Sequence, residues 1–185
     1  GSGLQYTYHN AKNAETFGIE LDMKKSLDFI GLRGLSLVCN AAYIHSRVRF
    51  EEGAPERDRP LAGQSPYLVN AGLFYQHDDK GISASLLYNR IGKRIESVGV
   101  PMQDQNEDIP DIYEMPRNSL DLTFSKKIGK AVEIKAGIQD MLNSKIEYKQ
   151  FVKLTDQNGG KREREQLVRS YRPGVDINVG VSLKF

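Results

Sequence analysis

The sequence has no tryptophan, a single cysteine and no long run of apolar residues. With Cys39 alone, neither an intrachain disulfide nor a cysteine-based metal cluster can form. A transmembrane helix needs roughly 18 consecutive apolar residues, and no run approaches that length, so helical membrane spanning is excluded. The 26 basic residues nearly balance the 24 acidic ones, which argues against a nucleic-acid partner because such partners require a strongly basic surface.

Motifs of catalysis and metal binding are also missing. His9, His45 and His77 lack the H-x-x-x-H and H-E-x-x-H spacings of metalloenzymes, and no G-x-S-x-G nucleophile elbow occurs. We therefore predict that the protein is not an enzyme and that it carries no cofactor and no catalytic metal. The acidic segment 104–114 lacks EF-hand spacing and is interpreted as a solvated loop, although calcium binding there stays open.

A strict alternation of residue types is present instead, and it is clearest in the last eleven residues. From Val175 to Phe185 every odd position is apolar, and every even position is charged, polar or glycine. Side chains on a strand point alternately to opposite faces, so this segment is predicted to be a strand with one apolar and one polar face. It is long enough to cross a membrane, because a tilted transmembrane strand needs about 9–11 residues.

The same pattern recurs along the chain after Gly1–Gly3, which we interpret as an expression scar preceding one domain, residues 4–185. The expected strands are residues 4–9, 17–24, 35–46, 67–76, 82–98, 120–125, 132–152 and 175–185, with a turn at 10–14. Their connections alternate: short ones lie near 25–34, 78–81 and 126–130, and long ones at 51–66, 99–117 and 153–168. An all-β, antiparallel up-and-down meander of about eight strands would place every long loop at one end, as in outer-membrane β-barrels.

Alternation does not by itself say which face points outward. The polar face carries large charged and amide groups, with glycines interspersed: Glu20, Asp22, Lys24, Asn70, Gln76, Asp121, Glu133, Lys135, Asp176, Asn178 and Lys184. A soluble β-barrel would turn its apolar face inward, whereas a transmembrane barrel would turn it toward lipid. The loop asymmetry and the terminal Phe185 favour the transmembrane β-barrel.

Several stretches resemble TonB-dependent outer-membrane receptors in order and spacing over essentially the whole chain: residues 17–21, 59–70, 88–95, 139–143 and 171–174. The resemblance implies a 22-stranded barrel with an N-terminal plug, of which this chain would supply roughly the last eight strands. The plug, the TonB box and most of that barrel are absent from these 185 residues. We therefore expect the C-terminal part of a longer protein.

The resemblance also implies partners and residue roles. The parent would take up a nutrient or metal-chelate complex with energy from the inner-membrane TonB complex, acting through the plug. The terminal strand resembles the signal read by the barrel-assembly machinery, here Val179, Val181, Leu183 and Phe185. Four residues near the loop end of a strand, Asn89, Arg90, Lys93 and Arg94, are predicted to line a basic lumen rim that draws in an anionic ligand.

Two other functions remain open at this stage. Eight strands can close into a small barrel filled by side chains, so the chain could be a self-standing outer-membrane anchor or adhesin. It could also be a soluble β-barrel that binds a small ligand in an apolar interior. The expected location of the receptor segment and of the self-standing barrel is the outer membrane of a Gram-negative bacterium. The soluble barrel differs from both in which face of the sheet is outside, and upstream coding sequence with a plug would separate the receptor segment from the self-standing barrel.

Overall fold

The computed structural model describes residues 11–100, 109–155 and 160–183. Within these ranges the chain is all-β, with one short 3₁₀ helix, η1 (Asp28–Ile30). The strands are β1 (Asn13–Ser26), β2 (Leu35–Arg49), β3 (Tyr67–His77), β4 (Ile82–Ile91), β5 (Arg94–Ser97), β6 (Ile112–Glu114), β7 (Arg117–Ile128), β8 (Val132–Gln139), β9 (Ile146–Thr155), β10 (Lys161–Tyr171) and β11 (Asp176–Leu183). In the same ranges, no helix is long and apolar enough to span a membrane.

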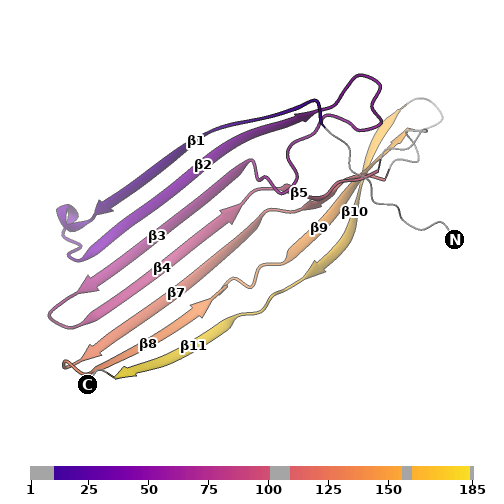
Figure 1. The fold of residues 1–185 in the computed structure, drawn as a ribbon. Coiled ribbons are helices and arrows are strands. Elements are labelled where there is room, and N and C mark those ends of the chain that lie inside the picture. Colours follow the sequence, from indigo (N-terminus) through magenta and orange to yellow (C-terminus); the bar gives the residue numbers. More distant parts are fainter. Residues whose placement is uncertain (1–10, 101–108, 156–159, 184–185) are drawn as a thin grey trace.

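The strands form an antiparallel up-and-down meander, as predicted (Figure 1). A seven-stranded sheet has the order β1-β2-β3-β4-β7-β8-β11, and a four-stranded sheet has the order β10-β9-β6-β5. Along the chain, β4 leads into β5, β6 into β7, β8 into β9 and β10 into β11. Four long strands are therefore each divided between the two sheets. Among the described residues, the outer strands β1 and β11 pair only with β2 and β8, so the large sheet has two open edges.

Several expected boundaries are wrong. Strand β1 already begins inside the turn expected at 10–14, because Asn13 pairs with Arg49. The long loop expected at 153–168 is largely a strand pair, β9 and β10, in which Lys153 lies opposite Glu163. Opposite charges across a strand pair are favourable, which explains how so charged a segment forms a strand. Residues 112–114 and 117 of another expected loop lie in β6 and β7. The expected strand 4–9 lies outside the described residues.

Register separates the large sheet into the two predicted faces. On one face, opposite residues across six neighbouring strands form an unbroken aliphatic row: Leu37, Leu73, Leu86, Leu122, Ile138 and Ile177. On the other face lie the predicted polar positions of the described strands, for example Gln76, Ser83, Ser125 and Lys135 in one row. We call these the apolar face and the polar face.

Almost no apolar side chain is buried within the described part of the chain. Only Val48, Ile95 and Tyr148 are buried apolar residues in this part, whereas most large apolar side chains of β1 and β11 are exposed. A water-soluble domain gains most of its stability from apolar burial, and this sheet does not bury its apolar face against another layer of its own chain. The described part of the chain therefore leaves the apolar face uncovered.

Gly34, in the connection between β1 and β2, gives a first testable prediction. Its φ is +75°, and a Cβ there would lie 2.2 Å from the Gln76 carbonyl oxygen. Gly31 in the same connection has φ +86° but open space around it. Gly31→Ala should cost only the left-handed backbone penalty, roughly 1–2 kcal/mol, and Gly34→Ala should cost clearly more. Urea unfolding in detergent micelles measures both free energies, and equal losses would contradict the register of β2 and β3.

Candidate functional site

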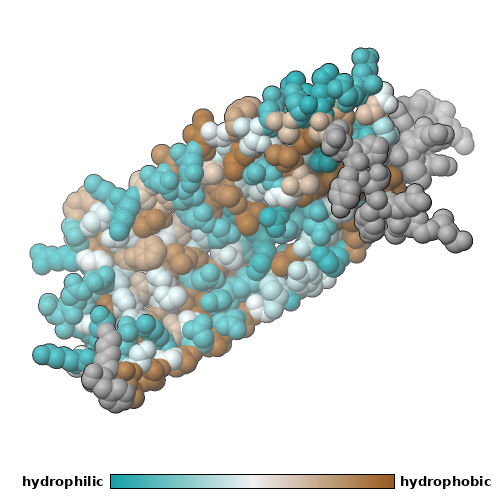
Figure 2. Space-filling model, viewed as in Figure 1, coloured by the Kyte–Doolittle hydropathy of each residue, from teal (hydrophilic) through white to brown (hydrophobic). Residues whose placement is uncertain are grey.

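The polar face of the large sheet is hollowed. A cavity of about 480 Å³ lies over it and is lined from β3, β4, β7, β8 and β11. Figure 2 looks into this hollow and shows mostly hydrophilic and neutral side chains at its centre. Two pairs of hydrogen-bonded hydroxyls line part of its wall. The Oγ atoms of Ser83 and Ser125 are 2.7 Å apart, and Ser85 Oγ is 2.6 Å from Thr123 Oγ1. The polar face is thus the concave side of the curved sheet.

A ladder of side-chain amides crosses the same polar face from β4 to β1. Asn89 Nδ2 donates to Asn70 Oδ1, and Asn70 Nδ2 donates to Asn40 Oδ1 at 3.3 Å. Asn40 Nδ2 in turn donates to Glu20 Oε1 at 2.8 Å and to Asp22 Oδ1 at 2.6 Å. All the amide donors point toward the two carboxylates. The ladder therefore leads from the middle of the wall to an acidic edge on β1.

The opposite face is apolar up to the last described residue. In β11 the exposed fractions of Val179, Val181 and Leu183 are 73%, 63% and 58%, and these side chains point away from the polar face. Three of the four residues of the predicted assembly signal are therefore accessible on the apolar face. The fourth, Phe185, lies outside the described residues.

The four residues predicted to line a basic lumen rim do not form one group. Asn89 lies on the polar face, in the amide ladder, while the adjacent Arg90 lies on the apolar face. Arg90 donates to the Tyr67 hydroxyl at 3.3 Å and to Asn118 Oδ1 at 2.8 Å. Successive side chains on a strand alternate in direction, so Asn89 and Arg90 cannot line the same wall.

The other two predicted residues lie at the small sheet. Arg94 donates two hydrogen bonds to Glu114 Oε2, at 2.9 Å from Nε and 2.7 Å from Nη2. Lys93 Nζ lies 4.6 Å from the ring centroid of Tyr113 and 4.7 Å from that of Phe151. A cation over aromatic faces is stabilised by the ring quadrupoles. Both cations thus have partners within the chain, and their predicted contact with a ligand stays a prediction.

Two of the stretches behind the family resemblance, residues 139–143 and 171–174, meet at the boundary between the two sheets. Residues 139–143 join β8 to β9, with positive φ at Asp140 and Asn143. Arg117 pairs with Asp140, and the Asp140 N–H donates to Asp121 Oδ1 at 2.8 Å. The facing connection between β10 and β11 holds Arg172, whose Nη1 donates to the Asn143 carbonyl at 2.5 Å. These polar contacts fix the bend at which the long strands pass from one sheet to the other.

No family model, no curated protein and no solved structure matches this chain.

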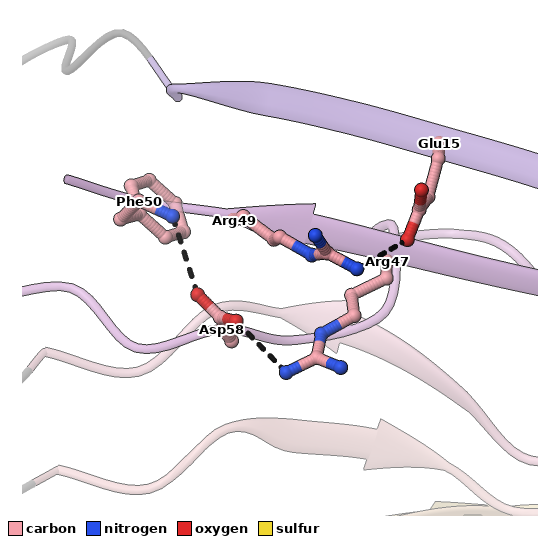
Figure 3. A network of polar contacts seen from close by, with 5 residues as sticks. All are labelled: Glu15, Arg47, Arg49, Phe50 and Asp58. Atoms are coloured by element: carbon pink, nitrogen blue, oxygen red, sulfur yellow. Dashed lines mark hydrogen bonds and ion pairs between the residues drawn. The ribbon is translucent and has the colours of Figure 1, made fainter.

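One carboxylate helps to hold the connection between β2 and β3 to the sheet, beside the backbone bridge of Val48 and Arg59 (Figure 3). Asp58 accepts a hydrogen bond from the Phe50 N–H at 3.2 Å and pairs with Arg47 at 3.0 Å. Between β1 and β2, Arg49 Nη2 forms an ion pair with Glu15 Oε1 at 2.9 Å. The Phe50 N–H, followed by Arg47, holds the pKa of the Asp58 carboxyl below its ordinary value of 3.8.

That lowered pKa predicts an acid-dependent loosening of the connection. A carboxyl whose pKa is lower in the folded state stabilises that state above its ordinary pKa, and the contribution disappears as the pH falls through the lowered value. We expect the Phe50 amide to be protected from hydrogen exchange, relative to its intrinsic rate, at pH values above 3.8 and to lose protection below. Asp58→Asn should show no such step, and a step of unchanged size in that variant would contradict the assignment.

The remaining predicted sites are dispersed. The His45 ring lies 4.9 Å from the Phe17 ring, and the Lys80 N–H bonds His77 Nδ1 at 3.4 Å. In the acidic segment, Asp111 accepts the Gly99 N–H at 2.8 Å and Glu114 is bonded to Arg94; Asp104, Glu107 and Asp108 lie outside the described residues. Among those that are described, no three His, Cys, Asp or Glu side chains form a group suited to a metal ion.

Sequence reasoning did not predict the amide ladder. Asn40, Asn70 and Asn89 all fall on polar-face positions of neighbouring strands, so their shared face could have been derived from the alternation. Their alignment in one row could not, because it depends on the register between strands. The site as a whole is a hydrogen-bonded polar surface, suited to contact polar groups.

Proposed function

We propose that this chain is a segment of an outer-membrane β-barrel, of the kind that TonB-dependent receptors use for energy-coupled uptake. The observation that supports this proposal is the two-faced sheet: its hollowed face is polar and hydrogen-bonded, while its other face carries an unbroken aliphatic row across six strands. A sheet that faces lipid on one side and a water-filled lumen on the other needs this division.

The backbone of the inner strands suits the same environment, whereas the two open edges need further strands to pair with them. In lipid, every backbone N–H and C=O must be hydrogen-bonded within the protein, which only helices and closed β-barrels achieve. The inner strands of the large sheet pair along both edges. The aliphatic row through Leu73, Leu86 and Leu122 then supplies surface whose transfer into lipid is favourable, at roughly 25 cal/mol per Å² of apolar area.

In this proposal the chain forms part of the barrel wall of the parent protein and helps to hold that protein in the membrane. The polar face lines the lumen, the connections at the far end help to capture a nutrient or metal-chelate complex, and the inner-membrane TonB complex acts through a plug supplied elsewhere. Val179, Val181, Leu183 and Phe185 present the C-terminal strand to the barrel-assembly machinery. The outer membrane of a Gram-negative bacterium is the proposed location.

The alternatives are less consistent with the arrangement of the faces. A soluble barrel that binds a ligand in an apolar interior would have a hollowed apolar face. Here the hollow lies over the face that carries Ser83, Ser85, Thr123, Ser125 and Lys135, with Phe74 beside them. A self-standing barrel that acts as an anchor shares the two-faced sheet. It differs from a receptor segment in requiring the chain to close on itself, and the two open edges favour the receptor segment.

Refolding into liposomes tests the proposal. The denatured protein is diluted into buffer with or without phosphatidylcholine liposomes, and the vesicles are then floated on a density gradient. We expect β-structure to float with the lipid and its apolar-face strands to resist proteolysis. A monodisperse, folded protein that stays in the aqueous fraction without detergent would contradict the proposal.

A further inference from the structure

The two open edges of the large sheet run in the same direction. Each neighbouring pair from β1 to β11 is antiparallel. The sheet has seven strands, and an odd number of alternating strands begins and ends with the same orientation. If β1 and β11 paired directly, they would form a parallel seam in an otherwise antiparallel sheet. An all-antiparallel closure therefore requires an odd number of additional strands between them.

A second copy of the described sheet cannot supply those strands. When two copies have the same orientation across a membrane, β11 of one again meets β1 of the other in parallel. When one copy is inverted, β1 can pair with β1 in antiparallel, but the long connections of the two copies then lie on opposite sides. Insertion of both copies from one side excludes that arrangement. The occupant of the edges must therefore be a segment that is not part of the described sheet.

The free edge of β1 also specifies the side chains of its partner. On the polar face this edge carries Glu20 and Asp22, which share the single amide nitrogen of Asn40 at 2.8 and 2.6 Å. Adjacent carboxylates repel each other, and one neutral amide leaves most of their acceptor sites unused. On the apolar face the same edge carries Ile19, Leu21 and Met23. A matching strand would place cationic or amide groups beside the carboxylates and apolar groups on the other face.

We infer that the free edges of β1 and β11 bind one further segment with an odd number of amphipathic strands, whose strand against β1 places Lys, Arg or amide side chains beside Glu20 and Asp22. This inference rests on the proposed barrel and names the partner that completes it. Backbone hydrogen bonds supply the attraction along each edge, and the side chains beside Glu20 and Asp22 supply the selectivity.

Disulfide trapping tests whether the edges close on each other. In a Cys39→Ser background, Asp22→Cys is combined with Asn178→Cys, Gly180→Cys or Ser182→Cys on β11, and the refolded protein is oxidised in micelles. The positive control combines Asp22→Cys with Asn40→Cys, which lie directly opposite each other. We expect the control to cross-link in most molecules and the three edge pairs to stay open. Intramolecular cross-linking of an edge pair to the level of the control would overturn the inference.

Peptide binding tests the predicted chemistry of the partner. Two synthetic amphipathic strands are compared in micelles, one with Arg at the positions beside Glu20 and Asp22 and one with Glu there. We expect the Arg peptide to bind about tenfold more tightly, and the Glu20→Gln, Asp22→Asn variant to remove the difference. Equal binding of both peptides to the unmodified chain would overturn the inference. Lipid flotation is a separate measurement, so a failure of the proposed membrane location remains distinguishable.

Discussion

Leu86→Arg is expected to destabilise the protein in lipid by about 2–4 kcal/mol, the cost of an arginine on the lipid face of a membrane barrel. Leu86 lies at the middle of the aliphatic row, between Leu73 and Leu122. An arginine there would carry its guanidinium into hydrocarbon, away from water and from any anionic partner. Reversible unfolding from liposomes by guanidinium chloride gives the free energy difference.

The next residue provides a matched control. Leu87 has nearly the same exposed fraction as Leu86, 38% against 36%, but it lies on the polar face opposite Asp121. In Leu87→Arg the new cation faces water and a carboxylate, so the loss should stay below about 1 kcal/mol. Equal losses in the two variants, or a larger loss for Leu87→Arg, would contradict the assignment of the faces.

Arg117→Met is the second substitution for which we expect a large effect. Arg117 pairs with Asp140 at the boundary of the two sheets, where the side chains are 27% and 14% exposed. Removing one partner leaves a largely buried carboxylate without its counter-charge, which costs about 3–5 kcal/mol when the pair is fully buried. Because this pair is partly exposed, we expect about 2–3 kcal/mol. Urea unfolding in micelles measures the loss.

An exposed ion pair serves as the control for this substitution. Lys12 lies 3.3 Å from Glu51, and their side chains are 57% and 67% exposed. Lys12→Met should cost less than about 1 kcal/mol, since exposed pairs contribute little. If Arg117→Met costs no more than Lys12→Met, the contact with Asp140 does not fix the bend between the sheets.

Most of the fold could be predicted from the sequence because side chains on a strand alternate between its two faces, with a period of two residues. Alternation in 17–24 and 175–185 was enough to place β1 and β11 and to assign each side chain to a face. The bends could not be predicted in this way. Asp140 and Asn143 interrupt the alternation through positive φ angles, and the backbone conformation of a non-glycine residue leaves no periodic signal in the sequence. The charged strand β10 was missed because the partners that neutralise it lie on β9.

The candidate site was less predictable. Asn89, Arg90, Lys93 and Arg94 are neighbours in sequence, and their proximity suggested one basic rim. The structure places Asn89 and Arg90 on opposite faces and gives Arg94 a carboxylate partner from β6. The relative direction of the two sheet edges was also beyond sequence reasoning, because it depends on how many strands lie between them.

The most direct test of the two-faced sheet is the depth of adjacent residues in a membrane. In a Cys39→Ser background, a nitroxide label is attached through Val179→Cys or Asn178→Cys, and the protein is refolded into liposomes. Oxygen concentrates in lipid and a charged nickel chelate stays in water, so relaxation by each reports the environment of the label. The two-faced sheet predicts preferential relaxation by oxygen at position 179 and by nickel at position 178. The reverse pattern would contradict it.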